Sequence, residues 1–424
     1  MVPQNSNMIG SVLLLAFHFP PENHIASERP RRFYKYLPRF RYDVLVVTAS
    51  AQAGMDPQKN VVCVADEARS KWAHPWSFAL RTLFKPFVRK DSLRWAVASY
   101  EAAARLILEN RVCAIVSTSP PIISNVVAGL LKKRYGIAWL ADFRDPIVGN
   151  PGRSRSKVSR LRDAIVERWS FRHANIVIAN TDAALEMWKR TYPHSAAKMH
   201  VIWNGFDRED SLGPLPLPQR GYRLLSHVGG MPIVRYPGLV LSSLRRLVHH
   251  GHLSRESFRV RLVGPLEEGW ARDPSLVAEL VRWGCLEYDG RMIPKKEAEQ
   301  EMASADSLLL LDWLSESGAT QVPAKLFEYV RIGRPILAVT TRGSPAERLL
   351  QRSGIPYCSI YPDDRAEDID QKILHFLSVP TEPVVANEWF WKEFDAVPQT
   401  QRLASLIASV ESCHHETQPC LEGA

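Results

Sequence analysis

The sequence predicts an α/β protein built from two Rossmann-like domains, each a doubly wound parallel sheet covered by helices. Three observations support this prediction. The chain of 424 residues is too long for one ordinary hydrophobic core. Short β-branched runs alternate with amphipathic helical stretches, first over residues 12–203 and again over 223–360, as in parallel strands joined by crossover helices. A Pro-rich run at 213–218 separates the two halves and suits neither a helix nor a central strand.

Residues 1–208 are expected to form the first domain, which we assign to the acceptor side. Its expected strands lie at 12–16, 43–48, 61–65, 114–117, 138–142, 176–179 and 200–203. Its expected helices include 93–109, 123–135 and 158–172. No Lys or Arg precedes the apolar stretch 9–19, and no small-residue cleavage site follows it. We therefore interpret this stretch as a buried first strand rather than a signal peptide.

Residues 209–220 are the predicted Pro-rich linker, and the alternation restarts in a second domain over 221–385. Its expected strands lie at 223–227, 259–263, 307–311, 335–339 and 357–360. Its expected helices include 237–249, 274–283, 295–304, 324–332 and 345–353. Segment 386–412, with a helix at 399–410, is expected to return to the first domain, and 413–424 to form a flexible tail. A ligand cleft between the two domains, at the carboxyl ends of both sheets, is expected.

The composition indicates a soluble globular protein, with 46% hydrophobic and 23% charged residues. No apolar run reaches the roughly 18 to 20 residues needed to cross a bilayer. The six cysteines form no CxxC pair and have no histidines at zinc spacing, which predicts reduced thiols in the cytoplasm and no metal site. The sequence contains neither an HExxH nor a GxSxG motif. We therefore favour a structural or surface role for the histidines His18, His24, His173 and His227.

The net charge of +9 is concentrated in the first half of the chain. Residues 1–210 carry 31 Lys and Arg against 18 Asp and Glu, a surplus of +13, whereas the remainder carries −4. This surplus suggests an anionic partner, which could be a phospholipid surface, a lipid-diphosphate acceptor or nucleic acid; a merely soluble surface is an equal alternative. The aromatic and basic segment 72–90 suits either a membrane interface or an ordinary packed helix.

The most informative segment is 322–339, where a helix is expected to begin near Pro323 and to end at Gly333 before a strand. Lys325 and Glu328 are three residues apart and share one helix face in the first turns. A helix N-terminus already attracts anions, so a lysine there suits a diphosphate, and the glutamate suits ribose hydroxyls. The alternative is an ordinary i,i+3 ion pair on an exposed helix.

In the first half, Asp142 and Asp145 flank Arg144 directly after the apolar run 137–141. They are therefore expected at the carboxyl edge of the first sheet, facing a ligand. Two carboxylates around an arginine can bind hydroxyls or shift each other's pKa, and we predict both aspartates as catalytic. The alternative is a buried ion pair that holds a loop in place.

Residues 323–339, PAKLFEYVRIGRPILAV, resemble the donor-site helix of retaining GT-B glycosyltransferases of the family-4 type, and nearly the whole chain follows that pattern. In order, residues 19–21 and 29–37 resemble the opening loop and first helix of the family. Segments 117–121 and 141–146 resemble signatures of the subgroup that builds cell-surface polysaccharides. Three further segments resemble the exit from the first domain, the glycine loop of the second and a later strand end, at 204–207, 227–230 and 262–264.

The resemblance implies a GT-B architecture and transfer of a sugar, with retention, from a nucleoside diphosphate sugar, a UDP-sugar first. It implies no metal or other cofactor, and an acceptor that is a glycan on a lipid carrier at the inner face of the cytoplasmic membrane. Arg235 and Lys325 would stabilise the diphosphate and join Asp142 and Asp145 as catalytic residues. The implied donor-binding set is Gly229, Gly230, Arg235, Gly264, Arg291, Thr320, Lys325, Leu326 and Glu328.

The sequence also departs from the family pattern. Thr320 stands where many members carry the first of two glutamates, and Asn125 stands where many carry a histidine. The first loop, 21–26, has lost its glycines. These departures keep open a catalytically silent GT-B partner subunit, beside a nucleotide-sugar epimerase. Nucleic-acid binding rests on charge alone and is not expected.

Overall fold

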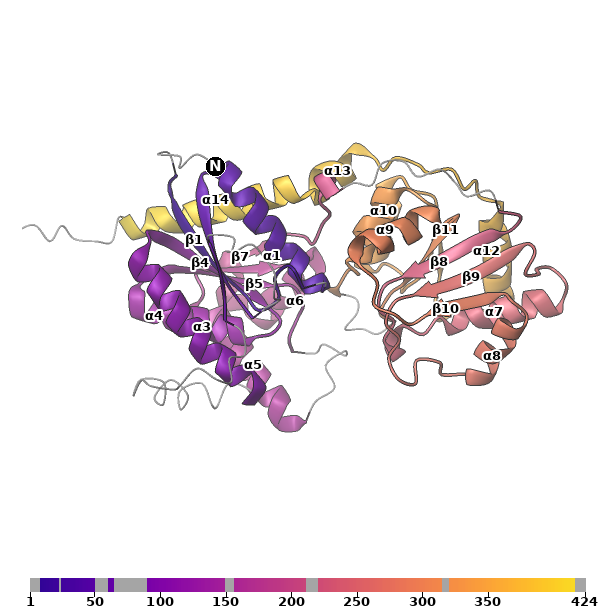
Figure 1. Cartoon of the computed structure of the whole chain (residues 1–424), viewed down its shortest axis with the longest axis horizontal. Helices are drawn as coiled ribbons and strands as arrows, with labels where there is room; N and C mark the ends of the chain where they lie inside the picture. Colours follow the sequence, from indigo (N-terminus) through magenta and orange to yellow (C-terminus); the bar gives the residue numbers. More distant parts are fainter. Residues whose placement is uncertain are drawn as a thin grey trace, which may run out of the picture. The chain divides into compact units, whose positions relative to one another are not determined.

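The computed structural model describes residues 8–22, 24–49, 60–64, 90–148, 156–210, 220–314 and 320–415. Two compact units are present: Met1–Gly205 together with Ala396–Ala424, and Phe206–Asp395 (Figure 1). The helix at the C-terminus thus belongs to the first unit. Linker residues 211–219 and segment 72–89 lie outside the described residues. Of the predicted tail 413–424, residues 413–415 belong instead to the last helix, and 416–424 lie outside the described residues.

The first unit contains a sheet that is parallel throughout its described strands, in the order β3-β2-β1-β4-β5-β6-β7. The strands are β1 (Gly10–Ala16), β2 (Tyr42–Thr48), β3 (Val61–Cys63), β4 (Val112–Ser119), β5 (Ala138–Phe143), β6 (Ile176–Ala179) and β7 (Met199–Val201). The sheet is buried on both faces, so its strands are continuous apolar runs rather than alternating ones.

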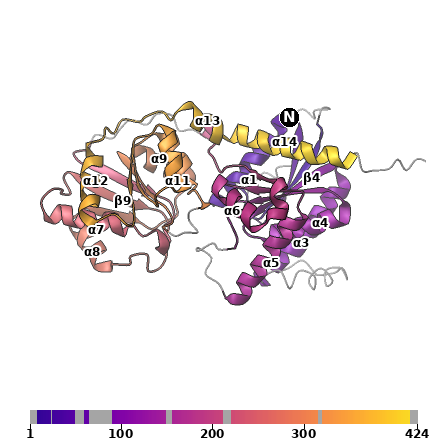
Figure 2. The same cartoon turned by 180° about the vertical axis from the view of Figure 1, so that it is seen from behind.

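Helices cover both faces of this sheet. Leu13 and Leu15 of β1 pack in one apolar cluster with α3 (Lys90–Glu109), α4 (Ile123–Tyr135), α5 (Lys157–His173) and α6 (Asp182–Thr191). Val12 and Leu14 point the other way, toward α1 (Ile25–Tyr36) and α14 (Ala396–His415). The yellow α14 lies along α1 (Figures 1 and 2). Short 3-10 turns complete the unit, at η1 (Leu37–Phe40) and η2 (Pro193–Lys198).

The second unit contains a parallel sheet in the order β10-β9-β8-β11-β12-β13 among its described residues. Its strands are β8 (Arg223–Val228), β9 (Phe258–Val263), β10 (Leu286–Asp289), β11 (Ser307–Leu311), β12 (Ile336–Val339) and β13 (Tyr357–Ile360). One face packs on α7 (Gly238–His249), α8 (Pro274–Arg282) and α12 (Ala366–Ser378). The remaining helical elements are η3 (Arg208–Asp210), η4 (Ile233–Arg235), α9 (Lys295–Ser304), α10 (Lys325–Ile332), α11 (Pro345–Ser353) and α13 (Glu388–Phe394).

The predicted fold class is confirmed, since both sheets are parallel and the strands predicted from apolar runs are present. Four elements were not predicted: β10, α6, α12 and α13. In β10, Glu287 and Tyr288 are exposed, so this edge strand lacks the apolar run that marks the others. The chain enters the first unit at Ala396 rather than at the expected residue 386, because α13 packs in the second unit through Phe390 and Phe394. No described helix is both long and apolar enough to cross a bilayer.

Close packing of α4 against α5 depends on one glycine. A Cβ built on Gly129 of α4 would lie 2.0 Å from the Trp169 side chain of α5. The Trp169 ring in turn packs on the buried Trp139, with 5.6 Å between ring centroids. The indole is rigid and held on both sides, so it cannot yield easily to a larger residue at position 129.

We expect Gly129→Ala to lower the free energy of unfolding of the first unit by about 1 to 3 kcal/mol, because overpacking outweighs the gain in helix propensity. Urea unfolding followed by tryptophan fluorescence would measure the change. Gly221→Ala is the control, because no atom lies within 4 Å of its added Cβ. An unchanged midpoint for Gly129→Ala would contradict this account of the contact.

Candidate functional site

The strand order of the second sheet reverses between β8 and β11, which are neighbours although distant in sequence. Ligands of doubly wound sheets bind outside the carboxyl ends of the strands at such a switch point. Three segments meet here: the glycine loop after β8, the residues after β11, and the start of α10. They carry Gly229, Asp312 and Lys325 respectively.

Lys325 is held by a buried histidine of β8. Its Nζ lies 2.9 Å from Nε2 of His227, whose Nδ1 lies 2.8 Å from the carbonyl oxygen of Leu309 in β11. A carbonyl can only accept, so Nδ1 carries the ring proton and Nε2 accepts a hydrogen bond from the lysine. Burial, together with the adjacent Lys325 charge, lowers the pKa of His227 well below its usual value. The ring is therefore neutral, and His227 is a satisfied core histidine, the interpretation that the sequence favoured.

The Lys325 side chain is half-buried at the start of α10. Burial, and then the positive charge of Arg235, lower the pKa of Lys325 well below its usual value. Two cations directed at one place, with no carboxylate among the causes of this shift, create a strong preference for an anionic ligand. The shift marks Lys325 as a functional candidate on physical grounds.

Two glycines allow the backbone to come close to Lys325. Gly229 has φ of 115°, and a Cβ there would lie 2.9 Å from the lysine Nζ. Gly264, at the end of β9, has φ of 125°, and its Cβ would lie 2.7 Å from the carbonyl carbon of Gly229. Gly229 is therefore restricted to glycine by its conformation, and Gly264 by conformation and by the nearby backbone. Backbone approach of this kind is what a phosphate cradle requires.

The residues after β11 add an aromatic and an acidic group that the sequence analysis did not single out. The Arg235 guanidinium lies 5.2 Å from the centre of the Trp313 ring, within cation–π range. Asp312 is 2% exposed and accepts hydrogen bonds from Thr340 Oγ1 at 2.8 Å and from the Trp313 N–H at 2.8 Å. Burial raises the pKa of Asp312 to about 6. The position of Asp312 directly after an apolar strand was the available sequence clue.

Glu328 does not pair with Lys325, as the alternative interpretation of this helix supposed. Its carboxylate lies 2.6 Å from Arg331, and the same guanidinium lies 3.1 Å from Glu299 of α9. Burial, and then the Glu328 charge, raise the pKa of Glu299. Arg331 also donates to the carbonyl of Asp207, at 3.0 Å. Glu328 is thus held in one orientation by Arg331.

The other predicted donor residues are placed less uniformly. Gly230 is exposed beside Gly229, and Thr320 is half-buried. Arg291 is exposed and pairs with Asp289 at 2.7 Å. Leu326 is fully buried, and its N–H donates to the Pro323 carbonyl at 2.9 Å. The structure therefore brings Gly229, Gly264, Arg235 and Lys325 together and gives Leu326 a place in the core.

In the first unit, Asp142 lies at the carboxyl end of β5 and is fully buried. It forms a two-pronged ion pair with Arg29 of α1, with Nη2–Oδ1 at 2.6 Å and Nε–Oδ2 at 2.9 Å. Arg29 also donates to the Trp203 carbonyl at 2.8 Å. This geometry favours the alternative interpretation of Asp142 as half of a buried pair that fixes local structure. Asp145 is half-buried nearby in sequence, and its catalytic role stays a prediction.

Asn125, at the position where many family members have a histidine, belongs to a buried polar network. Its Oδ1 accepts from Ser117 Oγ at 2.9 Å, and Ser117 accepts from Trp139 Nε1 at 2.8 Å. On the neighbouring loop, His18 lies 3.0 Å from Glu22 and stacks on His24 with ring centroids 4.3 Å apart. Burial, and then His18, lower the pKa of His24.

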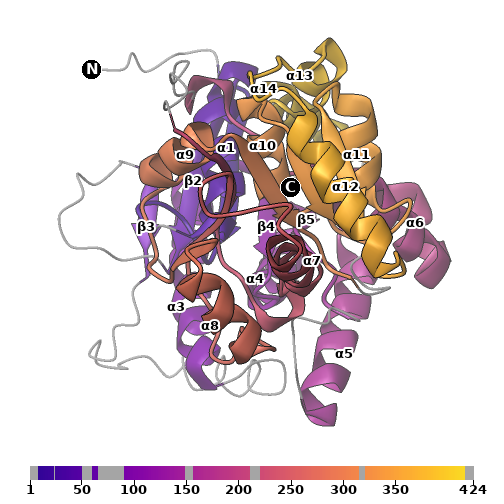
Figure 3. The same ribbon diagram turned by 90° about the vertical axis from the view of Figure 1, so that its right-hand side faces the viewer.

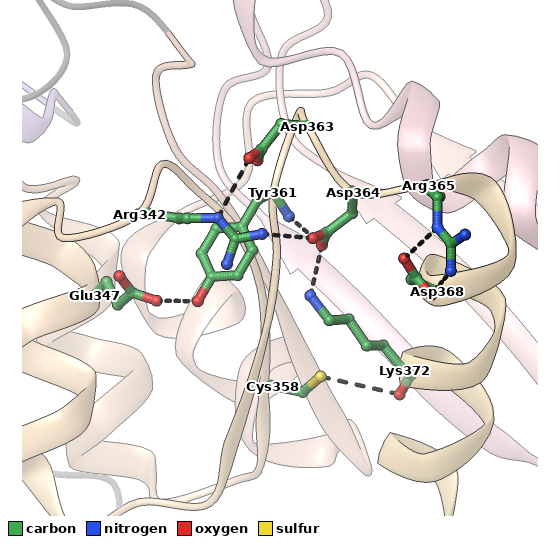
Figure 4. Close-up of polar contacts among 9 residues, drawn as sticks. All are labelled: Arg342, Glu347, Cys358, Tyr361, Asp363, Asp364, Arg365, Asp368 and Lys372. Atoms are coloured by element: carbon green, nitrogen blue, oxygen red, sulfur yellow. Dashed lines mark hydrogen bonds and ion pairs between the residues drawn. The ribbon is translucent and has the colours of Figure 1, made fainter.

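A second polar cluster lies at the carboxyl ends of β12 and β13 (Figure 4). The Tyr361 ring has Arg342 at 3.9 Å and Lys372 at 4.6 Å from its centre. Both cations pair with Asp364, at 2.9 and 2.5 Å. Burial and the hydrogen bond to Glu347 raise the pKa of Tyr361 to about 12. The cluster joins the loops after the two strands, and its cations are paired with carboxylates within it.

Replacing Asp142 by Asn separates its two interpretations. We expect Asp142→Asn to lower the free energy of unfolding by about 3 to 5 kcal/mol, because Arg29 would stay buried without its counter-charge. Urea unfolding would measure the loss. Glu186→Gln is the control, since its ion pair with Lys189 is largely exposed and worth at most about 1 kcal/mol. A fully stable Asp142→Asn protein that fails in sugar transfer would instead assign Asp142 to catalysis.

Comparisons with known proteins agree with the fold and the sequence motifs. Residues 31–210 match the family described as Glycosyltransferase Family 4. Over 217 residues the chain is 26% identical to a D-inositol 3-phosphate glycosyltransferase of Nocardiopsis dassonvillei; the match covers 48% of this chain and 48%, about half, of that relative.

Two solved structures share the fold over nearly the whole chain. Sucrose-phosphate synthase of Thermosynechococcus elongatus has 13% identity and a TM-score of 0.63, with 96% of this chain and 98% of that chain covered. Anabaena HepE in complex with UDP and glucose has 16% identity and a TM-score of 0.58, with 94% and 100% covered. Together with the two parallel-sheet units, these structural likenesses show that the chain has the GT-B fold, and the sequence match to Glycosyltransferase Family 4 covers residues 31–210.

Proposed function

We propose that this protein transfers a sugar from a nucleoside diphosphate sugar to an acceptor hydroxyl, with a UDP-sugar as the first candidate donor. The observation that carries the proposal is the poorly solvated Lys325 ammonium, which lies against Gly229 at the start of α10. The solved HepE complexes contain UDP and glucose or UDP-glucose, which favours the uridine nucleotide.

In the proposed donor complex, the diphosphate lies against Gly229 and Gly264 and accepts charge-assisted hydrogen bonds from Lys325 and Arg235. The N-terminal N–H groups of α10 add to this positive potential. The protein then acts by holding reactants in place and by stabilising the charge that develops on the departing diphosphate. The diphosphate itself can take the proton of the acceptor hydroxyl, so the proposal includes retention and requires no metal.

Glu328 is proposed to bind the donor ribose. A carboxylate accepts hydrogen bonds from hydroxyl groups, and the Glu328 carboxylate lies 2.6 Å from the Arg331 guanidinium. The pair with Arg331 would fix the orientation of the carboxylate before the ligand arrives, which lowers the entropy cost of binding. Thr320, Gly230 and Arg291 are proposed as further donor contacts at the rim of the site.

The proposed acceptor is a cell-surface glycan on a lipid carrier at the inner face of the cytoplasmic membrane. The +13 surplus of residues 1–210 suits a diphosphate-linked lipid or an anionic surface. A catalytically silent GT-B subunit is the second candidate, because Thr320 carries no carboxylate and Asn125 is fully buried within its hydrogen-bond network. Release of free nucleoside diphosphate from a sugar nucleotide in the presence of acceptor distinguishes the two.

We expect Lys325→Ala and Arg235→Ala each to weaken binding of UDP by about 10- to 100-fold, because a charge-assisted hydrogen bond contributes about 1.5 to 3 kcal/mol. Titration calorimetry would measure the affinity, with the other nucleoside diphosphates as a panel. Lys296→Ala in α9 is the control, as it removes an exposed lysine of the same unit. Wild-type affinity of both variants for every nucleoside diphosphate would show that the phosphate site lies elsewhere.

The lowered pKa of Lys325 predicts that nucleotide binding is coupled to proton uptake. A diphosphate favours the ammonium, so it raises the pKa of Lys325 in the complex above that of the unliganded protein. When the pH exceeds the pKa of the unliganded protein, each binding event must take up a proton, and UDP affinity falls as pH rises. Below that pKa the lysine is already charged and this dependence disappears.

Calorimetry between pH 7 and 9, in two buffers with different heats of ionisation, would measure the proton uptake. This range avoids the titration of the phosphate itself, whose second pKa is about 6. Lys325→Gln is the matched variant, which should bind UDP weakly and with little proton uptake. Equal uptake by Lys325→Gln and the parent protein would assign the proton to another group.

A further inference from the structure

The solvent-facing side of α5 has an unusual composition. Three apolar side chains are exposed there: Val158 at 76%, Leu161 at 64% and Ile165 at 51%. Positions 158, 161 and 165 follow helical i, i+3, i+7 spacing, so these side chains form one stripe along the helix. The stripe lies opposite the buried residues Val166, Ser170 and Phe171, which pack on the sheet.

Cations alone flank this stripe. The exposed charged residues of α5 include Lys157, Arg168 and Arg172, and no exposed residue of this helix is acidic. The two carboxylates of α5 are turned inward: Asp163 is 6% exposed and Glu167 is 2% exposed. Glu167 accepts hydrogen bonds from the N–H groups of Ile147 and Val148, both at 3.0 Å. The Glu167 carboxylate therefore interacts with groups inside the unit and does not neutralise the exposed cations of α5.

Elsewhere on the first unit, an exposed apolar side chain has a different environment. Leu108 of α3 is 76% exposed, but it stands alone beside the exposed Glu109. On α5, by contrast, the three apolar groups are adjacent, and the N-terminal half of the helix projects from the body of its unit (Figures 1, 2 and 3). A projecting helix can insert its apolar side chains into the headgroup region of a membrane. A stable protein complex, by contrast, needs a broad complementary surface that buries about 1,000 Å² or more in total.

We propose that the outer face of α5, formed by Val158, Leu161, Ile165, Lys157, Arg168 and Arg172, docks this protein on an anionic phospholipid membrane. The apolar stripe enters the boundary between headgroups and acyl chains, while the long cationic side chains reach the lipid phosphates. Anionic headgroups complement a face that has cations and no acidic group. The inference extends the proposed function by naming the surface that brings the enzyme to a lipid-linked acceptor.

Sedimentation of the full-length protein with vesicles tests the inference. Vesicles of phosphatidylcholine with about one-third phosphatidylglycerol should bind the protein at low salt, whereas pure phosphatidylcholine vesicles should bind it at least about tenfold more weakly. Leu161→Gln/Ile165→Gln removes the stripe and Arg168→Glu/Arg172→Glu reverses the charge. Each double variant should reduce binding to the anionic vesicles by about tenfold or more.

Matched controls change the same chemistry at other places. Leu108→Gln removes an equally exposed leucine from the same unit, and Arg272→Glu/Arg282→Glu makes the same charge change on the second unit. Both controls should bind vesicles like the parent protein. Thermal unfolding and UDP affinity are measured for all variants, because unchanged values show that the α5 substitutions leave the fold and the donor site intact.

Several results would overturn the inference. Parent protein that stays in the supernatant with anionic vesicles at low salt would exclude membrane docking. Wild-type vesicle binding by both α5 double variants would place the docking surface elsewhere. If only the charge variant lost vesicle binding, the apolar stripe would not contribute to docking. Binding to DNA without binding to vesicles would assign the basic face to a soluble polyanion. In each case, intact UDP binding would leave the donor-site proposal standing.

Discussion

A hydrogen bond from Lys325 to the neutral ring of His227 connects the three elements on which the proposed donor site depends. His227 belongs to β8, its other nitrogen bonds to Leu309 of β11, and Lys325 begins α10. The contact joins the two strands of the switch point to the helix that follows. Because a buried imidazole cannot easily become charged, it holds the lysine without neutralising it. The Lys325 amine therefore stays able to take up a proton when an anion binds.

The surrounding residues maintain this arrangement. Tyr329, one turn into α10, accepts a hydrogen bond from the Val228 N–H at 3.0 Å, so helix and strand are joined a second time. Gly229 and Gly264 make room for close backbone contact, and any side chain at Gly229 would meet Lys325. Arg331 fixes Glu328 on the next turn of the same helix. The site is therefore shaped by packing before a ligand binds, which is the condition that the proposed stabilisation of a diphosphate requires.

The two units treat charge differently at the carboxyl edges of their sheets. In the first unit, Asp142 is committed to Arg29 in a buried pair, and Arg144 donates to the Ala26 carbonyl at 2.6 Å. In the second unit, burial and then the positive charge of Arg235 lower the pKa of Lys325. The polar groups after β5 thus stabilise local structure, while those after β8 and at the start of α10 form the proposed anion site. Exposed cations of the described part of the first unit include Lys157, Arg168 and Arg172 of α5.

The sequence by itself determined the two parallel sheets, because apolar runs separated by amphipathic helices leave few other folds. It also determined the positions of Lys325 and of the glycines, since helix ends and close turns restrict residue type locally. Only the tertiary structure decided which side chains meet. The Lys325–His227 contact spans 98 residues and the Arg29–Asp142 pair spans 113, and neither separation follows a local period. Likewise, the exposed apolar stripe on α5 could be recognised only in the tertiary structure. Because α5 has apolar residues on several sides, its sequence does not predict which face is buried.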